Sequence, residues 1–251
     1  MITYEFPLNE RIRTMLRLED LYGRINHFIA RDSSDDHHAA IEILFDLVEV
    51  ASRANLKADL LQELDRQKRM LISLHDNPDV SEEALGTVLE KIERCQESLS
   101  AIAGKVGQPL RDNEWLMSIK QRASIPGGTC EFDLPSYHYW QQQDAATRRK
   151  FLTDWMEPME PIRRALSIVL RLLRDGGKEH RLVAQHGNFQ QMQGGRIAQM
   201  LRIILDDALP CIPEVSANKY ALSIRFIVAD YAAKSTLFDQ DVAFDLVFCS
   251  L

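Results

Sequence analysis

The sequence has few of the residues on which metal centres and disulfides depend. Its four cysteines, Cys95, Cys130, Cys211 and Cys249, are far apart, form no C-x-x-C pair and have no histidine at zinc-finger spacing. We therefore expect four free thiols in a reducing compartment and no metal site.

Long apolar runs are also missing. No stretch approaches the roughly 20 residues that a membrane-spanning helix needs, and the longest apolar segments, 41–50 and 242–251, are short and interrupted by acidic residues. The first residues do not combine a basic segment with an apolar one, so we expect no secretory signal. These absences predict a cytoplasmic protein without a membrane partner.

Positive charge is in deficit, since 30 Lys and Arg oppose 37 Asp and Glu and give a formal net charge of −7. Nonspecific nucleic-acid binding needs a basic footprint, so we expect no nucleic-acid partner. Against an acidic background, any local basic patch becomes more informative.

Catalytic and phosphate-binding motifs are absent as well. The chain contains no G-x-x-x-x-G-K-[ST], G-x-G-x-x-G, G-x-S-x-G or H-E-x-x-H sequence. Cys130 and His138 could be drawn as a nucleophile and a base, but a proline separates them and no third group is placed to orient the histidine. We expect neither an enzyme nor a bound cofactor.

Helical periodicity dominates the N-terminal two thirds. His37 and His38 fall in the first turn of the second predicted helix, where we expect them to be exposed. The helices at 57–75 and 81–103 are joined by a short turn and should form an antiparallel hairpin. Helices are predicted at 11–30 with Asn9 as cap, after the loop at 33–36, at 57–75, at 81–103, from a cap at Asp112 to 122, at 144–156 and at 161–174.

The one long break in this periodicity runs from 122 to 140. Pro126-Gly127-Gly128 ends a helix, and Pro135-Ser136 begins another that carries Tyr137, His138, Tyr139 and Trp140. The simpler interpretation is a helix-to-helix connection with its aromatic residues in the core. The alternative is a functional bend at which basic, aromatic and imidazole groups meet.

After Gly176-Gly177 the period changes to alternation, which is typical of strands. The runs at 181–190 and 197–205 flank Gly194-Gly195 and predict a hairpin. Clean alternation recurs at 220–226 and 242–248, with Lys219 and Arg225 on the open face of the sheet. The segment 2–6 also alternates, and we expect it to join the C-terminal sheet.

These patterns predict an α+β fold with two domains. Residues 8–177 would form a mainly helical domain with the long antiparallel hairpin. Residues 178–251, with the strand at 2–6, would form an antiparallel β domain.

A basic stripe marks the first predicted helix. Arg13, Arg17 and Arg24 lie within roughly 40° of one another at about 100° per residue. Such a stripe is usually a solvated face. It could instead form a cationic ridge for an anionic partner.

Four segments resemble the ZapD (YacF) family of bacterial cell-division proteins, in the same order and over nearly the whole chain. The block at 121–140 is the most specific of them. The segments are P-L-N-E-R-I-R-T-M-L-R-L-E at 7–19, L-L-Q-E-L-D-R-Q-K-R at 60–69, Q-R-A-S-I-P-G-G-T-C-E-F-D-L-P-S-Y-H-Y-W at 121–140 and N-K-Y-A-L-S-I-R-F at 218–226.

The resemblance implies a cytoplasmic, non-enzymatic homodimer at the midcell division site. It would bind the C-terminal tail of FtsZ, a short segment that mixes acidic and apolar residues. It would also cross-link FtsZ filaments and promote Z-ring assembly. The alternative is a dimeric adaptor that binds another acidic or amphipathic peptide.

The resemblance also implies which residues bind the tail. The chain departs from the family pattern at two places, because a further basic residue can occur at the position of Ala221 and another near Glu114. The matching basic positions are Arg13, Arg17, Arg111, Arg122, His138, Lys219 and Arg225. Arg122 and Arg225 could instead be partners in internal salt bridges.

Overall fold

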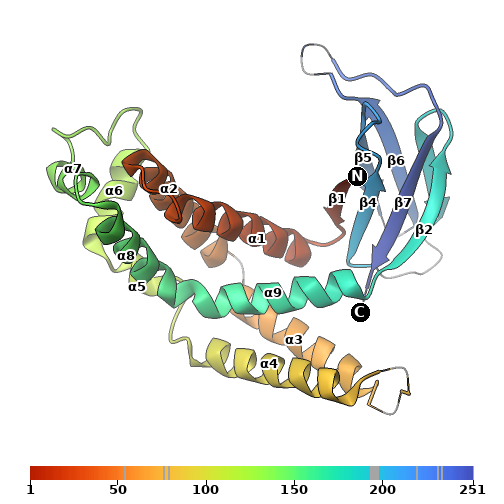
Figure 1. Cartoon of the computed structure of the whole chain (residues 1–251), viewed down its shortest axis with the longest axis horizontal. Coiled ribbons are helices and arrows are strands. Elements are labelled where there is room, and N and C mark those ends of the chain that lie inside the picture. The colour runs from red at the N-terminus through yellow and green to blue at the C-terminus, as the bar shows by residue number, and fades with distance from the viewer. Residues whose placement is uncertain are drawn as a thin grey trace. The chain divides into compact units, whose positions relative to one another are not determined.

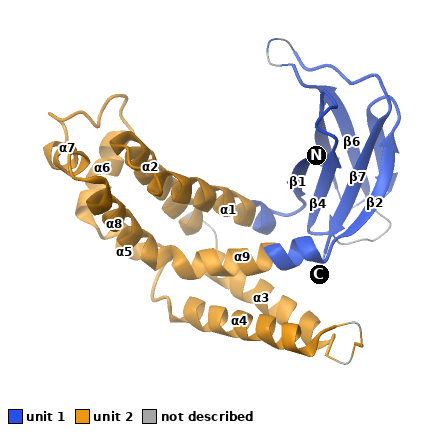
Figure 2. Ribbon diagram, in the orientation of Figure 1, with its two compact units in different colours: residues 1–13, 171–251 blue, residues 14–170 orange. Residues whose placement is uncertain are grey.

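The computed structural model describes the chain except residues 54, 76, 79, 193–197, 219, 231, 233 and 251, and only the backbone of Arg53. The predicted α+β class is confirmed, because helices fill the N-terminal part and antiparallel sheets the C-terminal part (Figure 1). Two compact units make up the chain (Figure 2). Residues 14–170 form the helical unit, and residues 1–13 and 171–251 form the β unit.

The first helix, α1 (Glu10–Ile29), begins at the predicted cap. The Oδ1 of Asn9 accepts a hydrogen bond from the backbone N–H of Ile12 at 2.9 Å, which satisfies one of the free donors at the helix start. Met15, Tyr22 and Ile25 are buried at helical spacing, as the apolar stripe predicts.

The next three helices include the predicted hairpin. α2 (Ser34–Arg53) is followed by α3 (Leu56–Ile72) and α4 (Glu82–Ala101), and α3 and α4 lie side by side. Ser81 caps α4 by accepting from the N–H of Ala84. The Lys57 ammonium donates to the carbonyls of Ser100 and Ile102 at the end of α4, where a cation stabilises the helix dipole.

Short helices follow, and one cap differs from the prediction. Asn113 rather than Asp112 caps α6 (Glu114–Ala123), because its Oδ1 accepts from the N–H of Leu116 at 3.0 Å. Asp112 instead ends the preceding turn, and its carboxylate accepts from Gln108. The other elements are α5 (Gln108–Arg111), α7 (Pro135–Gln141), α8 (Ala145–Met156), the 3-10 turn η1 (Glu157–Met159) and α9 (Glu160–Asp175).

The described residues of the β unit form two antiparallel sheets rather than one. The first has the order β1-β4-β7-β2 and the second the order β3-β6-β5. The strands are β1 (Ile2–Pro7), β2 (Lys178–Ala184), β3 (Asn188–Met192), β4 (Met200–Leu205), β5 (Cys211–Ala217), β6 (Ala221–Val228) and β7 (Val242–Cys249).

The prediction of a hairpin between 181–190 and 197–205 is wrong. A turn at 185–187 divides the first run into β2 and β3, and β3 pairs with β6 while β4 pairs with β1 and β7. Gly194-Gly195, on which the prediction depended, lies outside the described residues. Glycine pairs predict a turn, but they do not choose the partner strand.

The N-terminal strand joins the C-terminal part of the chain, as predicted. β1 pairs with β4 in antiparallel register, with Ile2 opposite Leu205. Arg174 adds a bidentate ion pair to Glu5, with both N–O distances at 2.7 Å. Both ends of the chain therefore contribute to one unit.

Apolar side chains of the two sheets share one core. The ring of Phe226 on β6 lies 5.1 Å from that of Phe244 on β7, and Phe189 on β3 lies 5.3 Å from Phe244. These rings connect strands of different sheets. Among the described residues, no helix is both long and apolar enough to cross a membrane.

Candidate functional site

The seven predicted binding residues are distributed over both compact units. Lys219 lies outside the described residues, and the meeting of the others in one pocket stays a prediction. Arg17, Arg111, Arg122 and His138 lie in the helical unit, and Arg13 and Arg225 in the β unit.

The three arginines of the basic stripe on α1 differ in whether an internal carboxylate already pairs with them. Arg13 pairs with Glu10 at 2.9 Å, and Arg24 lies 3.9 Å from Asp20. Arg17 is exposed and makes no hydrogen bond or ion pair within the described part of the chain. Arg17 is therefore the guanidinium of this stripe that a ligand can reach without displacing an internal partner.

Arg111 has a structural contact in addition to its predicted role. Its Nη2 donates to the backbone carbonyl of Val48 at 3.2 Å and links α5 to α2. A guanidinium has five N–H donors, so this bond leaves others for a ligand.

Arg122 on α6 and His138 on α7 both contact acidic residues of the loop that connects these two helices. Arg122 pairs with Asp133 at 3.6 Å, and the Nε2 of His138 lies 3.8 Å from Glu131. The two basic side chains are 48% and 43% exposed, and ion pairs that open to solvent contribute only about 0–1 kcal/mol. An acidic ligand could replace either internal carboxylate at small cost.

Arg225 points to solvent from β6. Asn188 and Glu214 are its neighbours across the two flanking strands. Its guanidinium has no hydrogen bond or ion pair within the described residues. The structure thus gives Arg122 an internal salt bridge and Arg225 none among these residues.

Comparison with known proteins identifies the family. A sequence model of the ZapD cell division protein matches residues 16–225. The Cell division protein ZapD of Chromobacterium violaceum is 57% identical over 250 residues and 99% of each chain, and that of Aromatoleum aromaticum is 54% identical over 251 residues, with 100% of this chain and 98% of its own covered. The chain belongs to the ZapD family. Its role therefore lies in cell division.

Cys130 and His138 could be drawn as a nucleophile and a base, but no hydrogen bond joins them in the described part of the chain. Cys130 is exposed, and the Nε2 of His138 lies 3.8 Å from the Glu131 carboxylate. In the described ranges, no three His, Cys, Asp or Glu side chains are arranged to hold a metal ion. Aromatic side chains instead gather around the helix that follows this bend.

An aromatic cleft in the helical unit was not predicted. It has a volume of about 430 Å³ and lies between α6, α7 and α8. Ser136, Gln143 and Thr147 contribute neutral polar groups to it. Its aromatic lining consists of Trp115, Tyr139, Trp140, Phe151 and Trp155.

The aromatic residues of the bend divide between the core and the surface. Tyr137 is fully buried and Trp140 nearly so, as expected of core residues, whereas Tyr139 is 71% exposed. The sequence does carry a signal for the cleft: Thr147, Phe151 and Trp155 recur at intervals of four and so lie on one face of α8. Only folding brings this face opposite Trp115.

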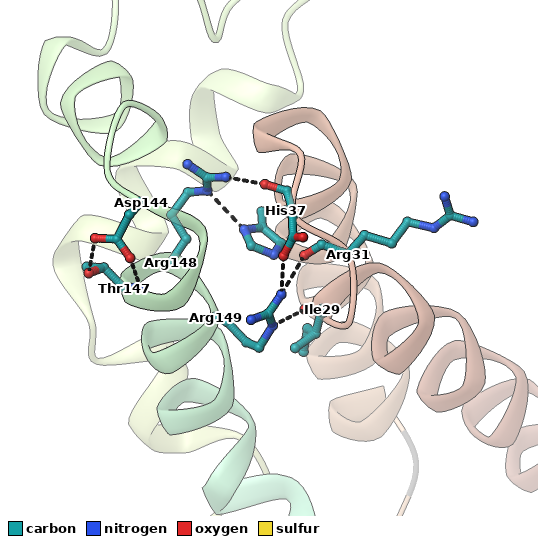
Figure 3. A network of polar contacts seen from close by, with 8 residues as sticks. Ile29, Arg31, His37, Asp144, Thr147, Arg148 and Arg149 are labelled. Atoms are coloured by element: carbon teal, nitrogen blue, oxygen red, sulfur yellow. Dashed lines mark hydrogen bonds and ion pairs between the residues drawn. The ribbon is translucent and has the colours of Figure 1, made fainter.

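A buried guanidinium next to the cleft face anchors α8 (Figure 3). Arg148 donates to the Nδ1 of His37 at 2.9 Å and to the carbonyls of Asp32, Gln141 and Gln143. These acceptors come from three segments of the chain. Arg148 thus holds α8, and the cleft residues on it, against the turn between α1 and α2.

Arg149 reinforces the same junction. It donates to the carbonyls of Ile29 and Arg31 and to the Asp32 carboxylate, the last at 2.6 Å. The N-terminal end of α8 is capped by Asp144, which accepts from Thr147. These hydrogen bonds lower the pKa of Asp144, so its charge is retained at the cap.

The predicted exposure of the two histidines is wrong. His37 is fully buried, and the Nδ1 of His38 lies 2.6 Å from the Tyr137 hydroxyl. Because Arg148 donates to the Nδ1 of His37, the neutral ring carries its proton on Nε2. Burial first, and the Arg148 charge to a smaller degree, lower the pKa of His37 below its usual range.

Proposed function

We propose that the chain is a cytoplasmic accessory protein that binds the C-terminal tail of FtsZ. Its family match over 210 of 251 residues, from 16 to 225, carries this proposal. The exposed, unpaired guanidinium of Arg17 supports it, because an acidic tail segment would find a cation that has no internal competitor.

Filament cross-linking follows if the protein forms a homodimer. A twofold dimer presents two copies of the tail-binding surface. A filament displays many tails, so the second contact forms at high effective concentration and needs no new interaction. The dimer would thus hold neighbouring filaments together in the Z-ring at midcell.

Co-sedimentation with polymerised FtsZ tests this function. The protein should pellet with full-length filaments and bundle them, and it should stay in the supernatant with tail-deleted filaments. Arg17→Glu should weaken binding about tenfold or more, since it replaces an attractive charge with a repulsive one. Lys91→Glu, which makes the same charge change on an exposed face of α4, is the matched control.

Two outcomes would contradict the proposal. Pelleting with neither filament would remove FtsZ as the partner. Equal pelleting with tail-deleted filaments would favour an adaptor for a different acidic or amphipathic segment. Cys130→Ala should bundle filaments as the wild type does, and a loss of bundling would instead indicate a role for the thiol.

A further inference from the structure

The aromatic cleft of the helical unit is open although its lining is apolar. Tyr139 and Phe151 are 71% and 43% exposed. Behind them the rings of Trp115, Trp140 and Trp155 lie 5.5–6.1 Å apart and form a packed wall. A concave apolar surface with a preformed wall is typical of a ligand site.

The lining indicates the chemistry of its occupant. None of the described residues that line the cleft carries a charge. A buried charge without a partner is costly, so a neutral apolar group is favoured over an ion. Aromatic walls with nearby hydrogen-bond donors also suit extended and proline-containing peptides.

One wall residue has an unused donor. The Nε1 of Trp140 is covered and has no acceptor among the described residues, whereas the Nε1 of Trp115 donates to the Ser136 hydroxyl at 3.1 Å. Buried donors without acceptors are rare in folded proteins. The indole N–H of Trp140 is therefore an unsatisfied donor, and because protein atoms cover it, the apolar part of the ring is what the wall offers to a ligand.

The cleft shares a helix face with a basic residue. Trp115 and Arg122 are seven residues apart on α6 and therefore lie on the same face, about 10 Å apart along the axis. That distance is spanned by about three residues of extended chain. His138, by contrast, lies on the side of α7 opposite Ser136 and Trp140, so it is not placed to complete this arrangement.

We propose that the cleft binds an apolar side chain of the FtsZ tail while Arg122 binds a carboxylate about three residues away. This inference rests on the proposed function and adds a second, apolar subsite to it. A peptide that mixes acidic and apolar residues matches the combination of a charged and an uncharged subsite on one helix face. Its carboxylate would replace Asp133, whose pairing with Arg122 is solvent-exposed.

Intrinsic fluorescence provides a direct readout, because all three tryptophans of the chain line the cleft. A synthetic peptide with the FtsZ C-terminal tail sequence should change the tryptophan emission saturably. The midpoint should agree with the Kd from fluorescence anisotropy of the labelled peptide. A peptide with its apolar residues replaced by serine should bind more weakly and leave the emission unchanged.

Two exposed rings can be removed with little risk to folding. Tyr139→Ala/Phe151→Ala should raise the Kd of the tail peptide about tenfold, as truncation of aromatic anchors commonly does. Phe132→Ala is the matched control, because Phe132 is 79% exposed but lies outside the cleft. This control should bind like the wild type.

The outcomes separate this inference from the function on which it rests. If the peptide binds the double variant and the wild type equally and leaves the emission unchanged, the cleft inference is overturned and tail binding stands. If the peptide and full-length filaments both fail to bind the wild type, both proposals fail. If the double variant loses self-association in light scattering but keeps its peptide affinity, the cleft is a contact between copies, and the inference is overturned.

Discussion

Two aromatic clusters with similar ring spacing lie in the two units, and they differ in exposure. In the β unit, Phe226 and Phe244 lie 5.1 Å apart, and both are buried. In the helical unit, Trp115 and Trp155 lie 5.5 Å apart beside the exposed rings of Tyr139 and Phe151. Ring contacts alone therefore do not distinguish a core from a binding surface.

The surrounding secondary structure explains the difference. The phenylalanines lie between two sheets, which cover them from both sides. The tryptophans are covered by helices on one side, and α7 is only seven residues long. We expect the closed cluster to contribute mainly stability and the open one mainly binding.

The largest change in stability is expected from a substitution in the closed cluster. Phe226→Ala should lower the free energy of unfolding of the β unit by about 3–5 kcal/mol, because the substitution removes buried apolar area and leaves a cavity between the sheets. Urea denaturation followed by far-UV circular dichroism measures this loss. A change below about 1 kcal/mol would mean that the two sheets do not depend on this contact.

A decrease in pH should have an intermediate effect on the stability of the helical unit. The folded pKa of His37 lies below the unfolded value of about 6.5, so the unfolded state binds more protons as the pH falls below that value. Protonation would also place two donors opposite each other at the bond between Arg148 and His37. Stability should therefore be complete above about pH 6.5 and decrease below it, by at most about 1.4 kcal/mol per pH unit for one proton.

Urea unfolding followed by tryptophan emission, between pH 7 and pH 5, measures this effect in the helical unit. His37→Asn keeps an acceptor for Arg148 but does not titrate. Its stability should depend less on pH than that of the wild type. Equal slopes for the two proteins would exclude His37 as the source of acid sensitivity.

The smallest expected effect is on the stability of the open cluster. Tyr139→Ala should change the free energy of unfolding by less than about 0.5 kcal/mol, since the ring is mostly in solvent. Thermal unfolding monitored by circular dichroism, with Phe132→Ala beside it, measures this change. A loss comparable to that of Phe226→Ala would show that the cleft is part of the core.

Local signals predicted much of the fold because they act within one helical turn or one strand. Asn9 caps a helix as predicted, and the alternation at Ile2, Tyr4 and Phe6 gives a strand in the C-terminal sheet. The cap at α6 was misplaced by one residue, since Asp112 and Asn113 are both competent caps. The pairing of β3 was missed because strand partners are chosen by long-range contacts.

The sequence by itself determined the helical and β regions, the family and the excess of acidic over basic residues. These properties follow from periodicity, composition and residue identity, which need no knowledge of distant contacts. Only the tertiary structure decided that His37 is buried against Arg148 and that three tryptophans from different helices form one open cleft. Burial and cleft formation depend on which segments meet in space, and here residues over 100 positions apart come into contact.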